Sequence, residues 1–299
     1  MGDDDSSRAS DQHDAGARVR ALRRADLGGL MRLKQSAGWN QTEQDWERLL
    51  ELEPAGCFGL ERDGAVVASS TALLYGQELA WIGMVLTLPE HRGQGYARRM
   101  MECAVSYAAQ RGVARAGLDA TDMGIALYRK LGFAPVEVVE RWERPAMEGA
   151  AAPAGVAEWE LDAALDRAAF GADRRRLLES LARAGAATAP GAAAAPHAAA
   201  LPDGSYAMGR AGARAAYFGP CVARSAAAAR QLLGWFLARH AGEAVYWDLL
   251  TENGAAVEMA AAHGFRRART LTRMVRELRS GGSAADSSLV FATAGLEFG

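Results

Sequence analysis

Lysine is almost missing from this chain. Lys34 and Lys130 are the only two lysines, and arginine supplies every other basic residue. Neither lysine stands in a Gly-Lys-Ser/Thr run, which excludes a Walker nucleotide loop. The fingerprint G-x-G-x-x-G of dinucleotide-binding folds is missing too, because Arg98 stands where its third glycine would be. Two common kinds of nucleotide site are therefore excluded.

Cysteine is scarce as well. Cys57, Cys103 and Cys221 are odd in number, far apart, and lack the spacing of metal or redox sites. We expect buried, reduced thiols, as in a cytoplasmic protein. No set of His, Cys and carboxylate residues has the spacing of a catalytic metal site, so no metal is expected.

Long apolar runs are also missing. No window of about 18 uncharged apolar residues exists, because prolines and a glycine interrupt the alanine-rich residues 184–201. The first residues lack the cationic and apolar segments of a signal peptide. A formal net charge of −2 gives no reason to expect nucleic acid or a membrane as a partner. We expect a cytoplasmic monomer or homodimer.

The most informative segment is the run Arg-Gly-Gln-Gly-Tyr-Ala at residues 92–97. The apolar residues 81–87 before it read as a buried strand, and residues 98–108 after it have helical apolar spacing. A turn between a strand and a helix start presents free backbone N–H groups and the positive end of the helix dipole. Gly93 and Gly95 lack a Cβ, so a ligand can approach the backbone closely. The segment predicts a phosphate or pyrophosphate site.

This run fits the pattern Q/R-x-x-G-x-G/A, with Arg92, Gly95 and Ala97 in its fixed positions. It resembles the pyrophosphate loop of the GNAT acyl-CoA N-acyltransferase superfamily. The later run Leu-Tyr-Arg-Lys-Leu-Gly-Phe at residues 127–133 resembles a second segment of that family, although Thr121 replaces its usual asparagine. The resemblance covers residues 17–144.

The chain then repeats this plan. Arg92 and Gly132 recur as Arg224 and Gly264, both 132 residues later, which indicates a tandem duplication. The second copy differs where the chemistry would lie: Gly93, Gly95 and Tyr128 are replaced there by Ser225, Ala227 and Ala260. Methyl groups obstruct close approach of a pyrophosphate, and alanine cannot donate a proton. We expect one catalytic half and one degenerate half.

The predicted fold class is α/β, an α+β mixed sheet, as two tandem GNAT folds with helices flanking each twisted sheet. We expect a disordered tail at 1–16, a catalytic domain at 17–144, a linker at 145–155 and a degenerate GNAT-like domain at 156–299. Predicted strands are 17–21, 55–61, 64–75, 78–87, 113–119, 133–143, 156–161, 205–210, 213–223, 244–249, 265–277 and 288–295. Predicted helices are 25–36, 42–51, 95–111, 122–131, 162–169, 173–184, 225–241 and 253–263.

The resemblance implies a site in which acetyl-CoA lies between two parallel strands that end near Thr87 and Asp119. Tyr128 is implied as the general acid that protonates the departing thiolate. The residues implied for acetyl-CoA are Val85, Leu86, Thr87, Arg92, Gly93, Gln94, Gly95, Tyr96, Ala97 and Thr121. Val85 and Leu86 also suit a core, and Thr121 also suits a helix cap.

Trp39 and Asn40, in the turn between the first two helices, are expected at the acceptor pocket. The general base is not assigned: Glu78, Asp119 or a chain of ordered water are the open alternatives. The expected activity is transfer of an acetyl group from acetyl-CoA to a primary amine of a small molecule, by direct attack. Two alternatives remain: acetylation of a protein lysine or N-terminus, and a non-catalytic acyl-CoA-binding sensor or scaffold.

Overall fold

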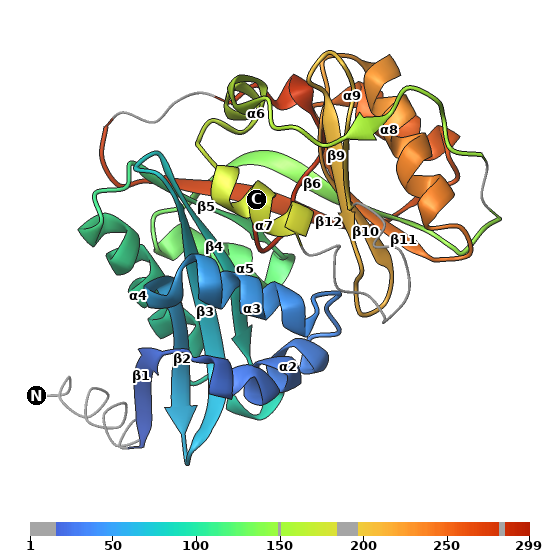
Figure 1. The fold of residues 1–299 in the computed structure, drawn as a ribbon. Coiled ribbons are helices and arrows are strands. Elements are labelled where there is room, and N and C mark those ends of the chain that lie inside the picture. The colour runs from blue at the N-terminus through green and yellow to red at the C-terminus, as the bar shows by residue number, and fades with distance from the viewer. Residues whose placement is uncertain (1–15, 149–150, 184–196, 281–284) are drawn as a thin grey trace, which may run out of the picture.

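The computed structural model describes residues 16–148, 151–183, 197–280 and 285–299. The predicted disordered tail therefore lies outside the described residues except for Gly16, as do two residues of the predicted linker. Figure 1 shows two lobes of helices and strands joined by long strands that run through both. Among the described helices, none is long and apolar enough to cross a membrane.

The first half contains all the helices and strands predicted for it, with ends that differ by one or two residues. Asp63 and Gly64 both have positive φ at the predicted hairpin turn, as a tight two-residue turn requires. The strands are β1 (Ala17–Ala21), β2 (Cys57–Arg62), β3 (Ala65–Tyr75), β4 (Leu79–Thr87), β5 (Arg115–Ala120) and β6 (Ala134–Arg144). The helices are α2 (Leu27–Ser36), α3 (Glu43–Leu52), α4 (Tyr96–Gln110) and α5 (Asp122–Lys130).

The second half repeats this plan with some departures from the prediction. Its helices are α6 (Ala163–Phe170), α7 (Arg175–Arg183), α8 (Ala226–Arg239) and α9 (Gly254–Ala262). Its strands are β7 (Ala157–Glu158), β8 (Ala198–Ala200), β9 (Tyr206–Arg210), β10 (Ala216–Val222), β11 (Val245–Leu250), β12 (Arg266–Glu277) and β13 (Val290–Ala292). β7 and β13 are much shorter than predicted. β8 was not predicted, because three alanines carry no β-branched signal.

All the described strands belong to one sheet. Its order is β1-β2-β3-β4-β5-β12-β6-β11-β10-β9-β8-β7, and β13 pairs with β10 off this path. β12 of the second half lies between β5 and β6 and pairs antiparallel with both, while β6 also pairs with β11. The two halves therefore exchange their long strands, which confirms the mixed α/β class and makes the two sheets continuous (Figure 1).

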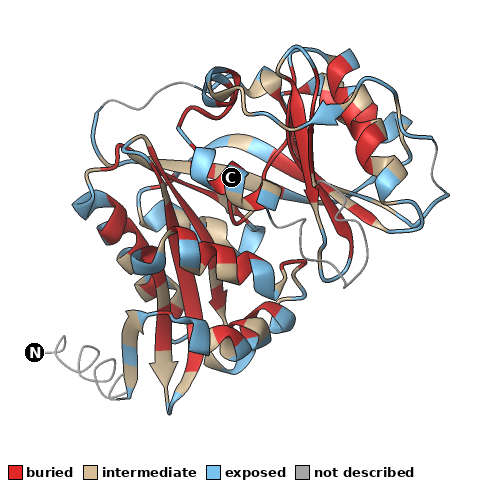
Figure 2. Ribbon diagram, viewed as in Figure 1, coloured by how far each residue is buried: buried red, intermediate tan, exposed pale blue. Residues whose placement is uncertain are grey.

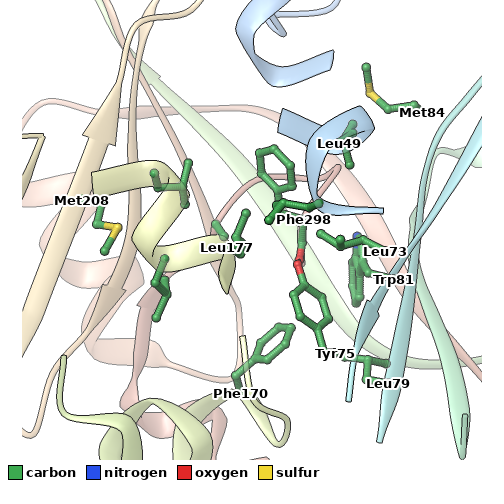
Figure 3. Packing of buried hydrophobic residues seen from close by; sticks show 14 of the residues in the cluster. Leu49, Leu73, Tyr75, Leu79, Trp81, Met84, Phe170, Leu177, Met208 and Phe298 are labelled. Atoms are coloured by element: carbon green, nitrogen blue, oxygen red, sulfur yellow. The ribbon is translucent and has the colours of Figure 1, made fainter. Parts of the chain in front are cut away.

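Figure 2 shows that the strands in the middle of the sheet are largely buried. Buried apolar residues pack on both faces of the sheet. Along β3, Leu73 and Tyr75 pack on the face covered by α2, α3 and α7, and Ala72 packs on the face covered by α4. Figure 3 shows that Phe298, the residue before Gly299, reaches into the first of these cores, beside Tyr75 and Trp81. The Tyr75 hydroxyl donates to the carbonyl of Phe298 at 2.6 Å. The end of the chain thus packs against the sheet of the first half.

Candidate active site

The two parallel strands β4 and β5 separate part-way along their length. They pair only from Leu79–Trp81 to Arg115–Gly117, and the rest of β4 leaves its edge toward β5 unpaired. An extra residue in β4 bulges the strand against β3, and Met84 takes a positive φ of 50° there. The Ser69 hydroxyl donates to the Met84 carbonyl at 2.8 Å and holds this bulge. The result is a gap bordered by free backbone groups.

Two adjoining cavities occupy this gap. The larger one, hereafter the cleft, has a volume of about 860 Å³ and extends from the 92–97 loop along the edge of β4. The smaller one, hereafter the chamber, has a volume of about 70 Å³ and lies deeper between the strands. Residues common to both linings are Trp39, Val85, Thr121, Tyr128 and Arg269. The cleft therefore opens into the chamber beside Tyr128.

The loop at the mouth of the cleft has the geometry of an anion site. Gly93 and Gly95 have φ values of 77° and 76°, and a Cβ at either position would meet no atom within 4 Å. Gly95 is the N-cap of α4 and no side chain caps the helix, so its first N–H groups face the cleft without a side-chain partner. This arrangement fits the diphosphate of a coenzyme A thioester.

Other predicted loop residues have different surroundings. Arg92, Tyr96 and Ala97 line the cleft, whereas Gln94 does not. The Gln94 side chain accepts a hydrogen bond from Arg62 at 2.8 Å. Gln94 therefore offers a ligand only its backbone.

Three buried polar atoms of residues in the cleft lining lack partners among the described residues. They are the Thr87 hydroxyl, the Nδ1 atom of His91 and the Nε atom of Arg269. Val85, Leu86 and Thr87 all line the cleft, at the unpaired edge of β4. Because buried polar groups are nearly always hydrogen-bonded in native proteins, these atoms indicate that a polar ligand completes the cleft.

Tyr128 projects from α5 at the junction of the two cavities. A Cβ on Gly124, one helical turn earlier, would lie 2.5 Å from the Tyr128 ring, so the ring occupies the space that this glycine leaves free. Burial raises the pKa of the Tyr128 phenol to about 12. No hydrogen bond to its hydroxyl is found within the described parts of the chain, so a protonated donor is available to a ligand.

Thr121 lines both cavities as the N-cap residue of α5. Its side chain makes no capping hydrogen bond. Of the two roles that the sequence left open, helix capping by the side chain is therefore not used, and the hydroxyl can contact a ligand.

Of the two residues predicted at the acceptor pocket, one lines the cavities and the other does not. Trp39 lines both cavities. Asn40 is buried outside them: its amide donates to the carbonyl of Ala215 at 3.0 Å and accepts from the backbone N–H groups of Arg214 and Ala215. Asn40 ties the first half to the second, and its neighbour Gln41 lines the chamber instead.

The carboxylates considered as general bases are occupied by arginines. Both oxygens of Asp119 accept from Arg273, at 2.9 and 3.0 Å, and Glu78 pairs with Arg167. Glu297 was not predicted, yet it lines the chamber together with Tyr128. No group of three potential metal ligands occurs in the described parts of the chain.

Glu297 reaches the chamber from the end of the chain. Its carboxylate accepts from Gln41 and Arg210, each at 2.6 Å, and burial raises the pKa of this carboxyl. A Cβ on Gly83 of β4 would lie 3.0 Å from the Glu297 backbone, so this glycine lets the C-terminal segment lie directly against the strand. Contacts between residues this far apart in sequence leave no local signal.

Comparison with known proteins agrees with this geometry. Residues 27–133 match the Acetyltransferase (GNAT) family, and residues 163–285 match an Acetyltransferase (GNAT) domain. The chain belongs to the GNAT family. It carries two GNAT domains in tandem, and the family is one of acyltransferases.

Relatives of this GNAT chain include an uncharacterized N-acetyltransferase, YitH, of Bacillus subtilis, which is 27% identical over 167 residues. That match spans 54% of this chain and 58% of the relative. A putative acetyltransferase from Pyrococcus horikoshii has the same fold, with a TM-score of 0.81 and 19% identity over 95% of this chain and 96% of its own. A tandem GNAT protein from the clavulanic acid biosynthesis pathway has a TM-score of 0.59 and 16% identity, covering 90% of this chain and all of that one.

The second GNAT domain has a corresponding gap between β10 and β11, but protein atoms fill it. The two strands pair in parallel only at residues 216–218 and 245–247, and β13 pairs with β10 just beyond. The Trp247 indole N–H donates to the carbonyl of Phe291 in β13 at 2.7 Å. At the start of α8, the Ser225 hydroxyl accepts from the N–H of Ala228 and caps the helix. The gap between parallel strands and the uncapped helix start are both open in the first domain. In the second domain, β13 fills the gap and Ser225 caps the helix.

Proposed function

We propose that this chain transfers an acetyl group from acetyl-CoA to a primary amine of a small molecule. The observation that carries the proposal is the continuity of cleft and chamber. One end has an uncapped helix start that suits a diphosphate, and the other has a small chamber whose lining includes the polar side chains of Gln41 and Glu297. Tyr128 lies where the two meet.

Binding of acetyl-CoA uses mainly the backbone in this proposal. The N–H groups of the 92–97 loop hold the diphosphate. The free edge of β4 at Val85, Leu86 and Thr87 bonds the pantetheine amides, as an added strand would. The thioester then lies beside Tyr128, with the chamber beyond it.

The reaction needs a neutral amine, because an ammonium has no free electron pair. Glu297 also bonds an arginine, Arg210, but burial raises the pKa of its carboxyl, so it is the chamber carboxylate that we propose to accept the ammonium proton, directly or through water. A main-chain N–H at the bulge of β4 stabilises the negative charge on the thioester oxygen during attack. As the C–N bond forms and the C–S bond breaks, Tyr128 donates its proton to the departing thiolate.

The enclosure of the chamber supports a small acceptor. Trp39 covers it from the first two helices, and Leu296 and Glu297 cover it from the C-terminal segment. A lysine of a folded protein would need an open groove at this point. The protein acetyltransferase alternative is therefore less well supported.

The test measures two quantities on the full chain: acetyl-CoA binding by calorimetry, and release of free thiol with a panel of small primary amines. We expect binding, and thiol release that depends on the amine. Binding without amine-dependent release would favour the sensor alternative. Release only with a protein or peptide acceptor would move the activity to macromolecules, and no binding would refute the site.

A further inference from the structure

Arg269 is the arginine that lines the chamber, and no counter-ion to it is found among the described residues. It is half-buried in β12 and lines both the chamber and the cleft. Its Nε atom is buried without a hydrogen-bond partner, and no ion pair to Arg269 is found in the described part of the molecule. Burial and the neighbouring Arg141 lower the pKa of this guanidinium. A cation held this way lowers the stability of the protein unless an anion joins it.

The strand register explains why Arg269 points into the site. Arg267 pairs with Trp142 of β6 and Arg269 pairs with Arg141, so one extra residue of β12 stands between the two pairs. Because consecutive residues of β6 point to opposite faces, Arg267 and Arg269 do too. Arg267 bonds Glu140 at 3.0 Å, and the bulge turns Arg269 to the face that lines the chamber.

The nearby carboxylates are already bound by other arginines. Asp119 is held by Arg273 through two bonds, and Asp248 is held by Arg141 through two bonds. The third, Glu297, bonds Arg210. None of these acids bonds Arg269, so within the described residues the site offers it no anion, and a ligand could supply one.

Coenzyme A is a poor source of this anion. Its phosphates belong at the 92–97 loop, which lines the cleft but not the chamber. Arg269 lies where the cleft meets the chamber, because it lines both cavities together with Tyr128. A guanidinium presents two parallel N–H donors that match the two oxygens of a carboxylate.

We propose that the acceptor is an amine that also carries a carboxylate, and that Arg269 binds this carboxylate within the chamber. This substrate class rests on the proposed acetyltransferase activity. The carboxylate anchors the acceptor at β12, and its amino group extends toward the thioester. Arg269 is thus a specificity residue that the second GNAT domain contributes to the site of the first.

The test compares matched acceptors with the full chain. Each α- or ω-amino acid of a panel is assayed beside its own amide, in which the carboxylate is neutral. We expect kcat/KM to be at least about tenfold higher for the acids, because charge-assisted bonds are the stronger ones. Arg269→Gln should remove this preference through KM of the acids, and Arg269→Lys should restore part of it. Arg266→Gln, an exposed arginine of the same strand outside both cavities, is the matched control.

The possible outcomes distinguish the carboxylate proposal from the proposed acetyltransferase activity. Acids and amides used equally well, or losses in Arg269→Gln that are equal for both, would overturn the carboxylate proposal and leave the acetyltransferase standing. Turnover of amino phosphates but not of amino acids would overturn it as well. Binding of acetyl-CoA without turnover of any carboxylate-bearing amine would also overturn it. Failure of acetyl-CoA to bind at all would instead refute the proposed function.

Discussion

Replacing Gly124 by alanine should slow acetyl transfer without destabilising the protein. The new methyl carbon would lie 2.5 Å from the Tyr128 ring, whereas ordinary contacts begin at 3.4 Å. The ring must therefore move by about 1 Å, and a catalytic group misplaced by that distance can lose about a hundredfold in rate. Alanine in a helix is favoured over glycine by about 0.5–1 kcal/mol, so the melting temperature should rise or stay unchanged.

The assay records kcat, acetyl-CoA affinity and thermal stability for the same preparations. Gly124→Ala should lower kcat and leave acetyl-CoA affinity within a factor of about two, because its methyl group touches only the Tyr128 ring at short range. Ala126→Gly is the matched control in the same helix, since Ala126 is exposed and lines neither cavity. It should lose about 1 kcal/mol of stability with unchanged kcat.

A double mutant tests whether the loss acts through the tyrosine. If the methyl group acts by moving the Tyr128 hydroxyl, Gly124→Ala should cost nothing further in a Tyr128→Phe background. Additive losses would show that the substitution harms the site by another route. An unchanged kcat in Gly124→Ala alone would refute the reasoning that the ring position matters.

Three further outcomes are expected. Gly95→Trp should abolish acetyl-CoA binding in calorimetry. Gly112→Trp, at a similar positive φ with equally open surroundings, is the control and should bind normally. Binding retained by Gly95→Trp would contradict the loop site. Tyr128→Phe should lower kcat by a constant factor between about pH 6 and 10, because a phenol with a pKa of about 12 stays protonated below that value. A loss that shrinks toward the alkaline end would show that the phenol ionises earlier. Calorimetry should give one acetyl-CoA per chain, since β13 fills the second gap, and two would contradict this.

The sequence predicts those features that depend on residues close to one another along the chain. The loop at 92–97, the helix that carries Tyr128 and the strands of the first half follow from spacing, glycines and apolar runs within a few residues. Asn40 shows where such reasoning stops. A polar amide in a turn suits a ligand, but its partners are backbone groups about 175 residues later. Nothing local distinguishes the two roles.

For the same reason, the sequence did not predict Arg269 and Glu297 on the proposed acceptor side of the site. Arg269 faces the chamber because β12 crosses into the first sheet and bulges against β6, and both features depend on pairing between distant strands. Glu297 lies there because Gly83 lets the C-terminal segment approach β4. A carboxylate two residues before Gly299 gives no signal of its own. The sequence therefore supports the donor half of the site better than the acceptor half.

The C-terminal segment, residues 290–299, contributes to both domains. β13 pairs with β10 in the gap of the second domain, where the strand edge would otherwise be free for a ligand. The residues that follow it turn into the first domain, where Trp81 donates to the carbonyl of Leu296 and Glu297 lines the chamber. One segment therefore closes the second site and completes the first. If the proposed function holds, the second domain takes part in the first site, because its C-terminal segment and β12 supply walls and charges that the acceptor would meet.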